Sequence, residues 1–472
     1  MSDPQIPQWT RSLYSQLTTT ANAPLPAELQ VSGTGHFPCA YPVTEFATAS
    51  IALASMALAA LMIESGVPVP SIDVDRRRAS LWFSTSFSPR GWALPPVWDA
   101  IAGDYVTADG WIRLHTNAPA HRKVVETVLG HHPDRQSLAL VVKKWHKQAL
   151  EQAIVESAGC AAQMRSPQEW QQHIQGKSVA QEPLFQHAFF SAQPKPDWPV
   201  SGQRPLQGIR VLDLTRIIAG PVATRFLAGF GADVLRIDPF GWDEASQEPE
   251  VTLGKRCARL NLHNRQDRHT FEQLLREADV IVHGYRAGAL QKLGYGTEQR
   301  RMLSPGLVDV CLNAYGWSGP WRERRGFDSL VQMSCGIAEQ GRRWADSQKP
   351  FPLPVQGLDH ATGYLMAATV LHGLTQRLRS GQGSETRLSL ARTAIELMQC
   401  STADSSNLNP DIGHTVKSDY ASTPEHTQWG EGWRLLPPVM LAGTAMTWDF
   451  AASTLGSAQA EWRETAVKKS QY

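Results

Sequence analysis

One carboxylate in the chain stands in a setting that suits covalent chemistry. Asp359 lies in Gly357-Leu-Asp-His-Ala-Thr-Gly, where a short apolar run ends and a helical spacing of apolar residues begins. Backbone N–H groups and the positive end of the helix dipole stabilise an anion at a helix start. Two interpretations are open: Asp359 is a helix N-cap, or it is an anionic nucleophile. This stretch alone favours the N-cap.

A segment near the N-terminus repeats this stretch. Residues 42–54 align with 356–368 at an offset of 314, which places Glu45 on Asp359. A second similarity follows in the same order, because Gly91-Trp-Ala-Leu-Pro-Pro-Val resembles Gly432-Trp-Arg-Leu-Leu-Pro-Pro-Val. Two similarities in one order indicate an internal duplication. Glu45 is then either a remnant of a second nucleophile or a helix cap, and its position favours the cap.

A regular alternation of strands and helices begins at residue 208. Strands are predicted over 209–214, 231–238, 259–262, 279–283 and 307–313, with helices over 222–230 and 267–277. This order predicts an α/β fold with a doubly wound, Rossmann-like parallel sheet, whose ligands bind beyond the carboxyl ends of the strands. The candidate ligand loops are 216–220, 238–242, 261–264, 283–288 and 315–320. No GxGxxG follows the first strand, so dinucleotide binding is disfavoured.

The rest of the chain predicts a smaller α+β domain and a linker. Residues 104–185 contain a hairpin, with Asp109-Gly110 as its turn, and helical segments. Residues 1–38 show only a weak pattern, so we expect a surface lead-in there. For the whole chain we expect four parts. The parts are a nucleophile-helix-like segment with a small α+β domain (1–195), a Pro-rich linker (196–205), a Rossmann-like domain with a nucleophile helix (206–400), and a small-domain-like tail that looks cut short (401–472).

Composition excludes several classes of protein. The formal net charge of the 472 residues is +1, so no global field favours nucleic acid or an anionic membrane. Six cysteines without a CxxC, and no secretory signal, favour reduced thiols in the cytoplasm.

The uncharged run 46–63 is rich in Ala, Ser and Thr, so we expect a buried helix and not a membrane span. His115, His121, His131 and His132 have no carboxylate or Cys at ligand spacing, so we expect surface histidines and no metal.

Several motifs follow one another in a fixed order across residues 206–400. They are Gly208-Ile-Arg-Val-Leu-Asp-Leu-Thr with Ala219-Gly-Pro, Leu227-Ala-Gly-Phe-Gly-Ala-Asp-Val-Leu-Arg-Ile-Asp-Pro, Gly254-Lys-Arg-Cys-Ala-Arg-Leu-Asn-Leu, Ala278-Asp-Val-Ile-Val-His-Gly-Tyr-Arg-Ala-Gly-Ala-Leu, Gly316-Trp-Ser-Gly-Pro, Gly326-Phe-Asp and Gly357-Leu-Asp-His-Ala-Thr-Gly. In this order they resemble the family III coenzyme A transferases, which include formyl-CoA:oxalate transferase, carnitine CoA-transferase and α-methylacyl-CoA racemase. Residues 41–190 resemble, more loosely, the nucleophile helix and small domain of that family.

The resemblance implies an enzyme that moves CoA from an acyl-CoA to a carboxylic acid. Asp359 would attack the thioester, pass through a mixed anhydride and an aspartyl-CoA thioester, and yield CoA to the acceptor acid. The implied CoA-binding residues are Ile218, Ala219, Leu260, Asn261, His263, Gly284, Tyr285, Arg286, Lys292 and Arg325. CoA and acyl-CoA are then substrates, and no cofactor is bound permanently. The implied partners are acyl-CoA, a small carboxylic acid and a second copy in a homodimer, with neither nucleic acid nor membrane.

Two departures from the family leave alternatives open. The racemase branch has a His before the Asp of its Gly-His-Asp motif, and here that position is Phe327, which cannot accept a proton. The glycine loop that covers the active site in formyl-CoA transferase is not found. An acyl-CoA isomerase or racemase, and a CoA-binding pseudoenzyme, are therefore the alternatives to CoA transfer.

Overall fold

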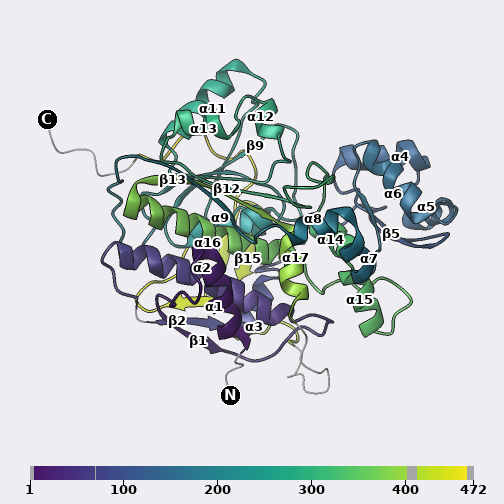
Figure 1. The fold of residues 1–472 in the computed structure, drawn as a ribbon, viewed down its shortest axis with the longest axis horizontal. Coiled ribbons are helices and arrows are strands. Elements are labelled where there is room, and N and C mark those ends of the chain that lie inside the picture. Colours follow the sequence, from purple (N-terminus) through teal and green to yellow (C-terminus); the bar gives the residue numbers. More distant parts are fainter. Residues whose placement is uncertain (1–4, 70, 401–411, 465–472) are drawn as a thin grey trace.

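A seven-stranded sheet forms the largest layer of the computed structural model, which describes residues 5–69, 71–400 and 412–464 (Figure 1). Its order is β10-β9-β8-β11-β12-β13-β7; β8 to β13 run parallel and β7 is antiparallel. In chain order from β8, this is the 3-2-1-4-5-6 order of a doubly wound sheet, so the predicted fold class is confirmed. The strands are β7 (Gln186–Ala192), β8 (Arg210–Leu214), β9 (Asp233–Asp238), β10 (Arg256–Arg259), β11 (Val280–His283), β12 (Val308–Asn313) and β13 (Gln382–Ser389).

Two hydrophobic clusters enclose this sheet, because successive strand residues point to opposite faces. On β8, Val211 packs with α9 (Ala219–Gly229) and α16 (Gly357–Ser380). Leu212 and Leu214 instead pack with α11 (Arg265–Glu277) on the other face. Because β8 is buried on both faces, its sequence is an almost continuous apolar run.

A three-stranded sheet in the N-terminal part repeats one end of the large sheet. β1 (Glu28–Ser32) runs parallel to β2 (Ser71–Asp75), as β12 runs parallel to β13. β16 (Val439–Leu441) is antiparallel to β2, as β7 is antiparallel to β13. Since β16 comes from the C-terminal part and β7 from the N-terminal part, each part of the chain donates a strand to the sheet of the other.

Two long helices, α2 (Val43–Glu64) and α16, pack against each other (Figure 1). Their first residues meet, because Val43 Cγ1 lies 3.5 Å from the position that a Cβ on Gly357 would take. α2 is long and apolar enough to cross a membrane, but 89% of its most apolar window is buried inside the protein. The prediction of a buried helix for residues 46–63 is confirmed.

The smaller α+β region contains the sheet β4 (Gly103–Thr107), β5 (Gly110–Leu114) and β6 (Ala161–Gln163). Its core cluster holds residues of α4 (Pro119–Leu129), α5 (Arg135–Val142) and α6 (Lys147–Glu156). A separate cluster joins β6 to α14 (Asp328–Cys335) of the large domain. The other elements are α3 (Arg76–Trp82), β3 (Phe87–Pro89), α7 (Pro167–Gln172), α8 (Ile174–Ala180), α10 (Glu248–Val251), α12 (Ala289–Lys292), α13 (Thr297–Leu303), α15 (Ile337–Trp344), α17 (Leu390–Met398), β14 (Glu425–Thr427) and β15 (Gly430–Arg434).

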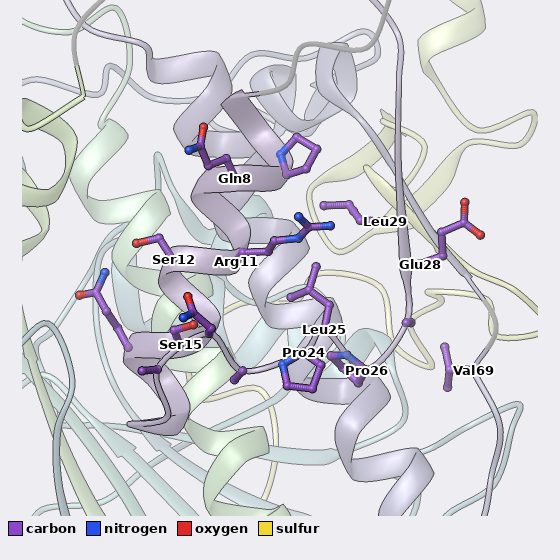
Figure 2. Close-up of a pocket in the computed structure, with 16 residues that line it drawn as sticks. Gln8, Arg11, Ser12, Ser15, Pro24, Leu25, Pro26, Glu28, Leu29 and Val69 are labelled. Carbon is purple, nitrogen blue, oxygen red and sulfur yellow. The ribbon is translucent and has the colours of Figure 1, made fainter.

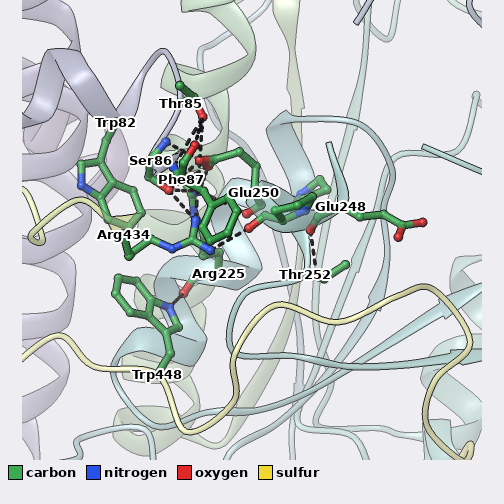
Figure 3. A network of polar contacts seen from close by, with 12 residues as sticks. Trp82, Thr85, Ser86, Phe87, Arg225, Glu248, Glu250, Thr252, Arg434 and Trp448 are labelled. Carbon is green, nitrogen blue, oxygen red and sulfur yellow. Dashed lines mark hydrogen bonds and ion pairs between the residues drawn. The ribbon is translucent and has the colours of Figure 1, made fainter. Parts of the chain in front are cut away.

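A buried polar network ties distant segments to the large domain (Figure 3). Glu250 accepts hydrogen bonds from Ser86 at 2.6 Å and from Arg225 at 2.7 Å. Arg434 of β15 also donates to Ser86, at 2.8 Å. Burial opposes ionisation of Glu250, but Arg225 and Arg434 hold its pKa below the ordinary value. The charged network therefore anchors both an N-terminal loop and a C-terminal strand.

Some expectations from the sequence are wrong. Residues Gln5–Thr18 form helix α1, whose Ile6, Trp9 and Leu13 lie in the main core, so this helix is not part of a surface lead-in. β10 ends at Arg259, so residues 260–262 belong to a loop and not to the predicted strand. Parts of the predicted tail, 401–411 and 465–472, lie outside the described residues, and the four domain boundaries stay a prediction.

Candidate active site

Asp359 is the third residue of α16, and its side chain does not cap the helix. The N-cap position is Gln356, where no side chain makes a capping hydrogen bond. Asp359 is only 7% exposed, and within the described part of the chain its carboxyl has no hydrogen bond or ion pair. The N-cap interpretation is therefore wrong. What remains is a buried carboxyl without a compensating partner, which is an energetically costly group.

A second carboxyl, that of Asp328, lies at the start of the same helix. Its Oδ2 accepts a hydrogen bond of 2.9 Å from the backbone N–H of Asp359, and its Oδ1 accepts one from Gln332. Burial and the Asp328 charge raise the pKa of Asp359 well above its ordinary range. Burial also raises the pKa of Asp328 to about 6. Since two neighbouring buried carboxyls resist ionising together, the pair favours the state in which one proton is retained.

The turn between β8 and α9 lies one helical turn from Asp359. A Cβ on Gly363, one turn further along α16, would stand 2.5 Å from the carbonyl oxygen of Ala219. Only a glycine permits this close approach of the first turn of α9 to α16. The nucleophile candidate and the first predicted CoA-binding loop are therefore neighbours.

The carboxyl ends of β8 and β11 flank the point where the strand order reverses, which is the usual ligand crevice of such sheets. Ile218 and Ala219 begin α9 at this point. Gly284, Tyr285 and Arg286 follow β11 directly. These five predicted CoA-binding residues are thus brought to one edge of the sheet.

A second group of predicted CoA-binding residues lies along the same edge of the large sheet. Arg268 donates to the carbonyl oxygen of Leu262 at 3.3 Å and to that of Leu293 at 2.6 Å. This places the loop after β10 beside the end of α12. The side chain of Leu260 is buried in the core, so only its backbone could meet a ligand. The predicted residues in this group are Leu260, Asn261, His263 and Lys292.

Arg325 lies where the small α+β region meets the large domain. It donates to the carbonyl oxygen of Ala158 at 2.9 Å. Burial, and then the charges of Arg325 and Arg286, lower the pKa of His121 to about 4. Burial and the charge of Arg286 also lower the pKa of Arg325. Among the described residues neither arginine has a carboxylate partner, so the two cations suit an anionic group such as a phosphate.

His115 is not a surface residue, so that prediction is wrong. It is 6% exposed, and its ring stacks on Phe327 with the centroids 3.9 Å apart. Burial, followed by the charge of Arg113, lowers the pKa of His115 to about 3, so the imidazole is neutral. By contrast, the side chain of His131 is 75% exposed, as expected. Within the described ranges, no group of three or more His, Cys, Asp or Glu could hold a metal.

The sequence did not assign a function to three residues that the structure makes candidates. Asp328 stands in the Gly326-Phe-Asp motif, but no local pattern shows that it reaches a residue 31 positions away. Arg216 and Trp242 lie in the predicted ligand loops, yet residue type alone does not show that they contact each other. A motif can thus mark a residue as a candidate, whereas its partner is set by tertiary packing.

Two well-formed grooves on the described residues lie away from Asp359. The larger, of about 1280 Å³, lies between α1 and residues 21–29 (Figure 2). Its lining includes Arg11 of α1 and Glu28 of β1. The smaller, of about 430 Å³, is lined by residues near β10 and β14. Neither of these two grooves is lined by Asp359 or by a predicted CoA-binding residue.

The sequence is similar to proteins of one enzyme family. The model of CoA-transferase family III matches residues 206–448 of the 472. An acyl-CoA transferase of Gibberella moniliformis (strain M3125 / FGSC 7600) is 31% identical over 302 residues, covering 59% of this chain and 53% of that protein. Formyl-CoA:oxalate CoA-transferase of Escherichia coli O81 (strain ED1a) is 27% identical over 218 residues, covering 43% and 52%.

The crystal structure of Rv3272 from M. tuberculosis is 29% identical, with a TM-score of 0.37, and the match covers 42% of this chain and 58% of that one. The chain spans about half the length of the curated relatives it matches. The family match itself covers half of the sequence and includes strands β8 to β13 of the large sheet, Asp328 and Asp359. The chain therefore belongs to CoA-transferase family III.

Proposed function

We propose that this chain transfers coenzyme A from an acyl-CoA thioester to a carboxylic acid through a covalent Asp359 intermediate. The observation that carries the proposal is the buried, unpaired carboxyl of Asp359 beside the β8–α9 turn. Family membership supports it. Further support comes from relatives named for exchange between two acids, such as succinyl-CoA:glutarate CoA-transferase of Mus musculus. CoA acts here as a substrate and not as a resident cofactor.

In the first half-reaction, the Asp359 carboxylate attacks the carbonyl carbon of the thioester. The C–S bond breaks, CoA leaves as a thiolate, and a mixed anhydride joins Asp359 to the acyl group. The thiolate then attacks the aspartyl carbonyl carbon. The donor acid leaves as a carboxylate, and Asp359 now carries CoA as a thioester.

The second half-reaction runs the same steps in reverse with the acceptor acid. The acceptor carboxylate attacks the aspartyl carbonyl carbon and releases the CoA thiolate. The thiolate then attacks the acyl carbonyl of the new anhydride, Asp359 leaves as a carboxylate, and acceptor acyl-CoA forms. Each step exchanges one oxygen or sulfur partner on a carbonyl carbon, so no net proton transfer is needed.

Asp328 acts as a positioning residue in this scheme. It accepts the backbone N–H of Asp359 and so fixes the first turn of α16. Burial, and then the charge of Asp328, favour the protonated form of Asp359, whereas attack requires the ionised form. We therefore expect acyl-enzyme formation to become faster as the pH rises through the pKa of Asp359.

Trapping of the intermediate tests the proposal. The enzyme is incubated with a panel of acyl-CoA donors and then with hydroxylamine, which converts an activated aspartyl group to a hydroxamate. Mass spectrometry should find the adduct in the wild type and none in Asp359→Ala. Undiminished trapping in Asp359→Ala would contradict the assignment of the nucleophile. Tight CoA binding without exchange across a broad panel of acids would instead support a CoA-binding pseudoenzyme.

An acyl-CoA isomerase or racemase is the second candidate, favoured by one observation. Phe327 cannot move a proton, but the neutral imidazole of His115 stacks directly on its ring. Deuterium from solvent would then enter the carbon next to the thioester without acyl exchange. Exchange between acids without deuterium entry would exclude this candidate.

A homodimer, which the resemblance to the family implies, and a cytoplasmic location, which the cysteine usage favours, are further proposals. The mass of the purified protein in solution, measured by sedimentation, decides between monomer and dimer. A single species of about 52.1 kDa would contradict the dimer.

A further inference from the structure

The sheet of the small α+β region turns one of its faces toward α14. On β5, Ile112 points into the core of that region, and successive strand residues point to opposite faces. Trp111 therefore points the other way, and it packs beside the cluster that joins β6 to α14. His115 follows on the same side, where its ring stacks on Phe327. Arg113 stands between Trp111 and His115 in this alternation, so its side chain also faces α14.

The guanidinium of Arg113 is held in one orientation, and one of its edges is free. Its Nη1 donates a hydrogen bond of 2.7 Å to Asp104, the residue directly opposite on β4. Its carbon lies 4.7 Å from the ring centroid of Trp98. Among the described residues Nε and Nη2 have no hydrogen-bond partner, although Nε is buried. These two groups point in the same direction, so together they can bind a carboxylate with two parallel hydrogen bonds.

His115 adds a second unpartnered group on this face. Its side chain is 6% exposed, and its buried Nδ1 has no hydrogen-bond partner in the part of the chain that the structure describes. Its ring meets that of Trp98 edge to face, with the centroids 5.8 Å apart. Because nearly all buried polar groups have a partner, Nε of Arg113 and Nδ1 of His115 together indicate a ligand group that the chain does not supply.

This face lies close to the two carboxyls of the candidate active site. Phe327, on which His115 stacks, directly precedes Asp328, and Asp328 accepts the backbone N–H of Asp359. Burial raises the pKa of Asp328, and the positive charge of Arg113 is one of the effects that oppose this rise. Charges act in this way over short distances. Arg113 therefore lies near the carboxyl that contacts the nucleophile candidate.

The aromatic wall of this site comes from the repeated segment 91–97, which Trp98 directly follows. In the second copy of the segment, the corresponding residue is Met440 of β16, which is 59% exposed. In the first copy, no strand forms at this point, and Trp98 lies over the guanidinium of Arg113 instead. The cation and its aromatic wall are thus a feature of the first copy alone.

We propose that an acid that exchanges CoA on this chain is a dicarboxylic acid, whose second carboxylate binds the free edge of Arg113 and Nδ1 of His115. The inference rests on the proposed function and names its substrate class. One carboxylate of the acid reacts at Asp359, as described above, while the other accepts hydrogen bonds from the two side chains of β5. A monocarboxylic acid leaves these buried donors unpaired, which is costly. The small α+β region then selects the acid, whereas the large domain supplies the nucleophile.

Acceptor acids of matched length test this site. Malonate, succinate, glutarate and adipate are compared with propionate, butyrate, pentanoate and hexanoate, with an acyl-CoA donor that labels Asp359 in the trapping experiment. For at least one pair, kcat/KM of the wild type should be about tenfold higher or more for the dicarboxylate, because hydrogen bonds to charged groups contribute that much.

Variants of β5 show which side chains cause this preference. In Arg113→Met, the ratio of kcat/KM for the dicarboxylate to that for its monocarboxylate match should fall about tenfold. Arg113→Lys keeps the charge but not the two parallel donors, so it should restore only part of the ratio. His115→Phe keeps a ring to stack on Phe327 and removes Nδ1, so the ratio should fall by less than in Arg113→Met.

The matched control is Arg135→Met. The guanidinium carbon of Arg135 also lies over an aromatic ring, 5.6 Å from the centroid of Tyr105, and its Nη2 donates to the carbonyl oxygen of Asp104 at 3.3 Å. Tyr105 belongs to the core of the small region, so this arginine is not on the face toward α14. Its loss should leave the ratio at the wild-type value. Thermal melting shows which variants are folded, and Arg113→Lys preserves the test if Arg113→Met does not fold.

The outcomes separate this inference from the proposed function. If the wild type forms no acyl-enzyme and exchanges CoA with no acid, the proposed function itself is contradicted. If it exchanges CoA but prefers no dicarboxylate, or if Arg113→Met loses both series of acids equally, the dicarboxylate site is overturned and the proposed function stands. An equal fall of the ratio in Arg135→Met would also overturn the dicarboxylate site.

Discussion

The units α2–β2–α3 and α16–β13–α17 share one construction and differ at the carboxylate. Each consists of a long helix, a strand and a second helix, with a constant offset of 314 residues from Glu45 to Asp359 and from Asp75 to Ser389. In both, the residue before the second helix caps it: Asp75 accepts a hydrogen bond from the third residue of its helix, and so does Ser389. The duplication is therefore visible in backbone geometry as well as in sequence.

The starts of the two long helices also match. Pro42 has φ −76° and ψ 65°, and Gln356 has φ −74° and ψ 64°. Each forms an inverse γ-turn, closed by a hydrogen bond of 2.8 Å from Val43 to Tyr41 in one unit and of 2.7 Å from Gly357 to Val355 in the other. The same turn thus introduces both helices and places their acidic residues alike.

The surroundings of the two carboxylates differ. Glu45 forms an ion pair of 2.5 Å with Arg76, whereas the position equivalent to Arg76 in the second unit is Leu390. Pro42, not Glu45, is the N-cap of α2, so the expected capping role of Glu45 is wrong. The shared fold therefore supplies the position of the carboxylate in both units. A missing cation leaves Asp359 available for chemistry.

The largest effect is expected from Asp359→Asn. It should abolish the trapped intermediate and yet raise the melting temperature. Burial and Asp328 raise the pKa of Asp359 in the folded chain above the ordinary value of about 3.9, so ionisation favours the unfolded state as the pH rises through the folded pKa. The gain in melting temperature should therefore be larger at pH 8 than at pH 5. A lower melting temperature at pH 8 would contradict this account.

Glu45→Gln should have the opposite pattern. It leaves the buried Arg76 side chain without this partly buried carboxylate, which should lower the free energy of unfolding by about 3 kcal/mol. Trapping per folded molecule should be unchanged. The double variant Glu45→Gln/Arg76→Leu removes both charges, and it places a leucine where the second unit has Leu390. It should therefore recover part of the stability. Urea unfolding measures both, and an equal loss in the single and double variants would argue against the ion pair.

Asp328→Asn should shift the pH dependence of acyl-enzyme formation without abolishing it. Asparagine can still accept the backbone N–H of Asp359, but it removes a neighbouring negative charge. The pKa of Asp359 should then fall, and the rate profile should move to lower pH by about one unit. Trapping rates between pH 5 and 9 measure the shift; a profile that moves to higher pH would refute the coupling of the two carboxyls.

The smallest effects are expected at the two caps. Asp75→Ala and Ser389→Ala each remove the side-chain acceptor of a helix N-terminus and should each cost about 1 kcal/mol of stability. Equal losses in urea unfolding would show that the two units use their caps alike. A loss confined to one variant would limit the duplication to backbone geometry.

The sequence predicts the large sheet because its local pattern is decisive. The apolar run around Val211 and Leu212 belongs to a strand that is buried on both faces, and such runs alternate with helical spacing after residue 208. The helix over Gln5–Thr18 is absent from the prediction, although Ile6, Trp9 and Leu13 recur at helical spacing. Here the signal was present in the sequence.

Other features could not be predicted, because they depend on long-range packing. The exchange of β7 and β16 between the two sheets pairs segments far apart in the chain, and no local period records such a pairing. Burial of His115 results from its stacking on Phe327, which directly precedes α14 of the large domain. The motif around Asp359 identified the candidate nucleophile, whereas only the fold shows its neighbour Asp328.

Peptide mapping of the wild-type protein after hydroxylamine trapping decides whether Asp359 is the nucleophile, because both matched carboxylates are then compared in one sample. The account predicts a hydroxamate on the peptide that contains Asp359, and an unmodified Glu45, whose carboxylate is paired with Arg76. A hydroxamate on Glu45, or equal modification of the two, would contradict it.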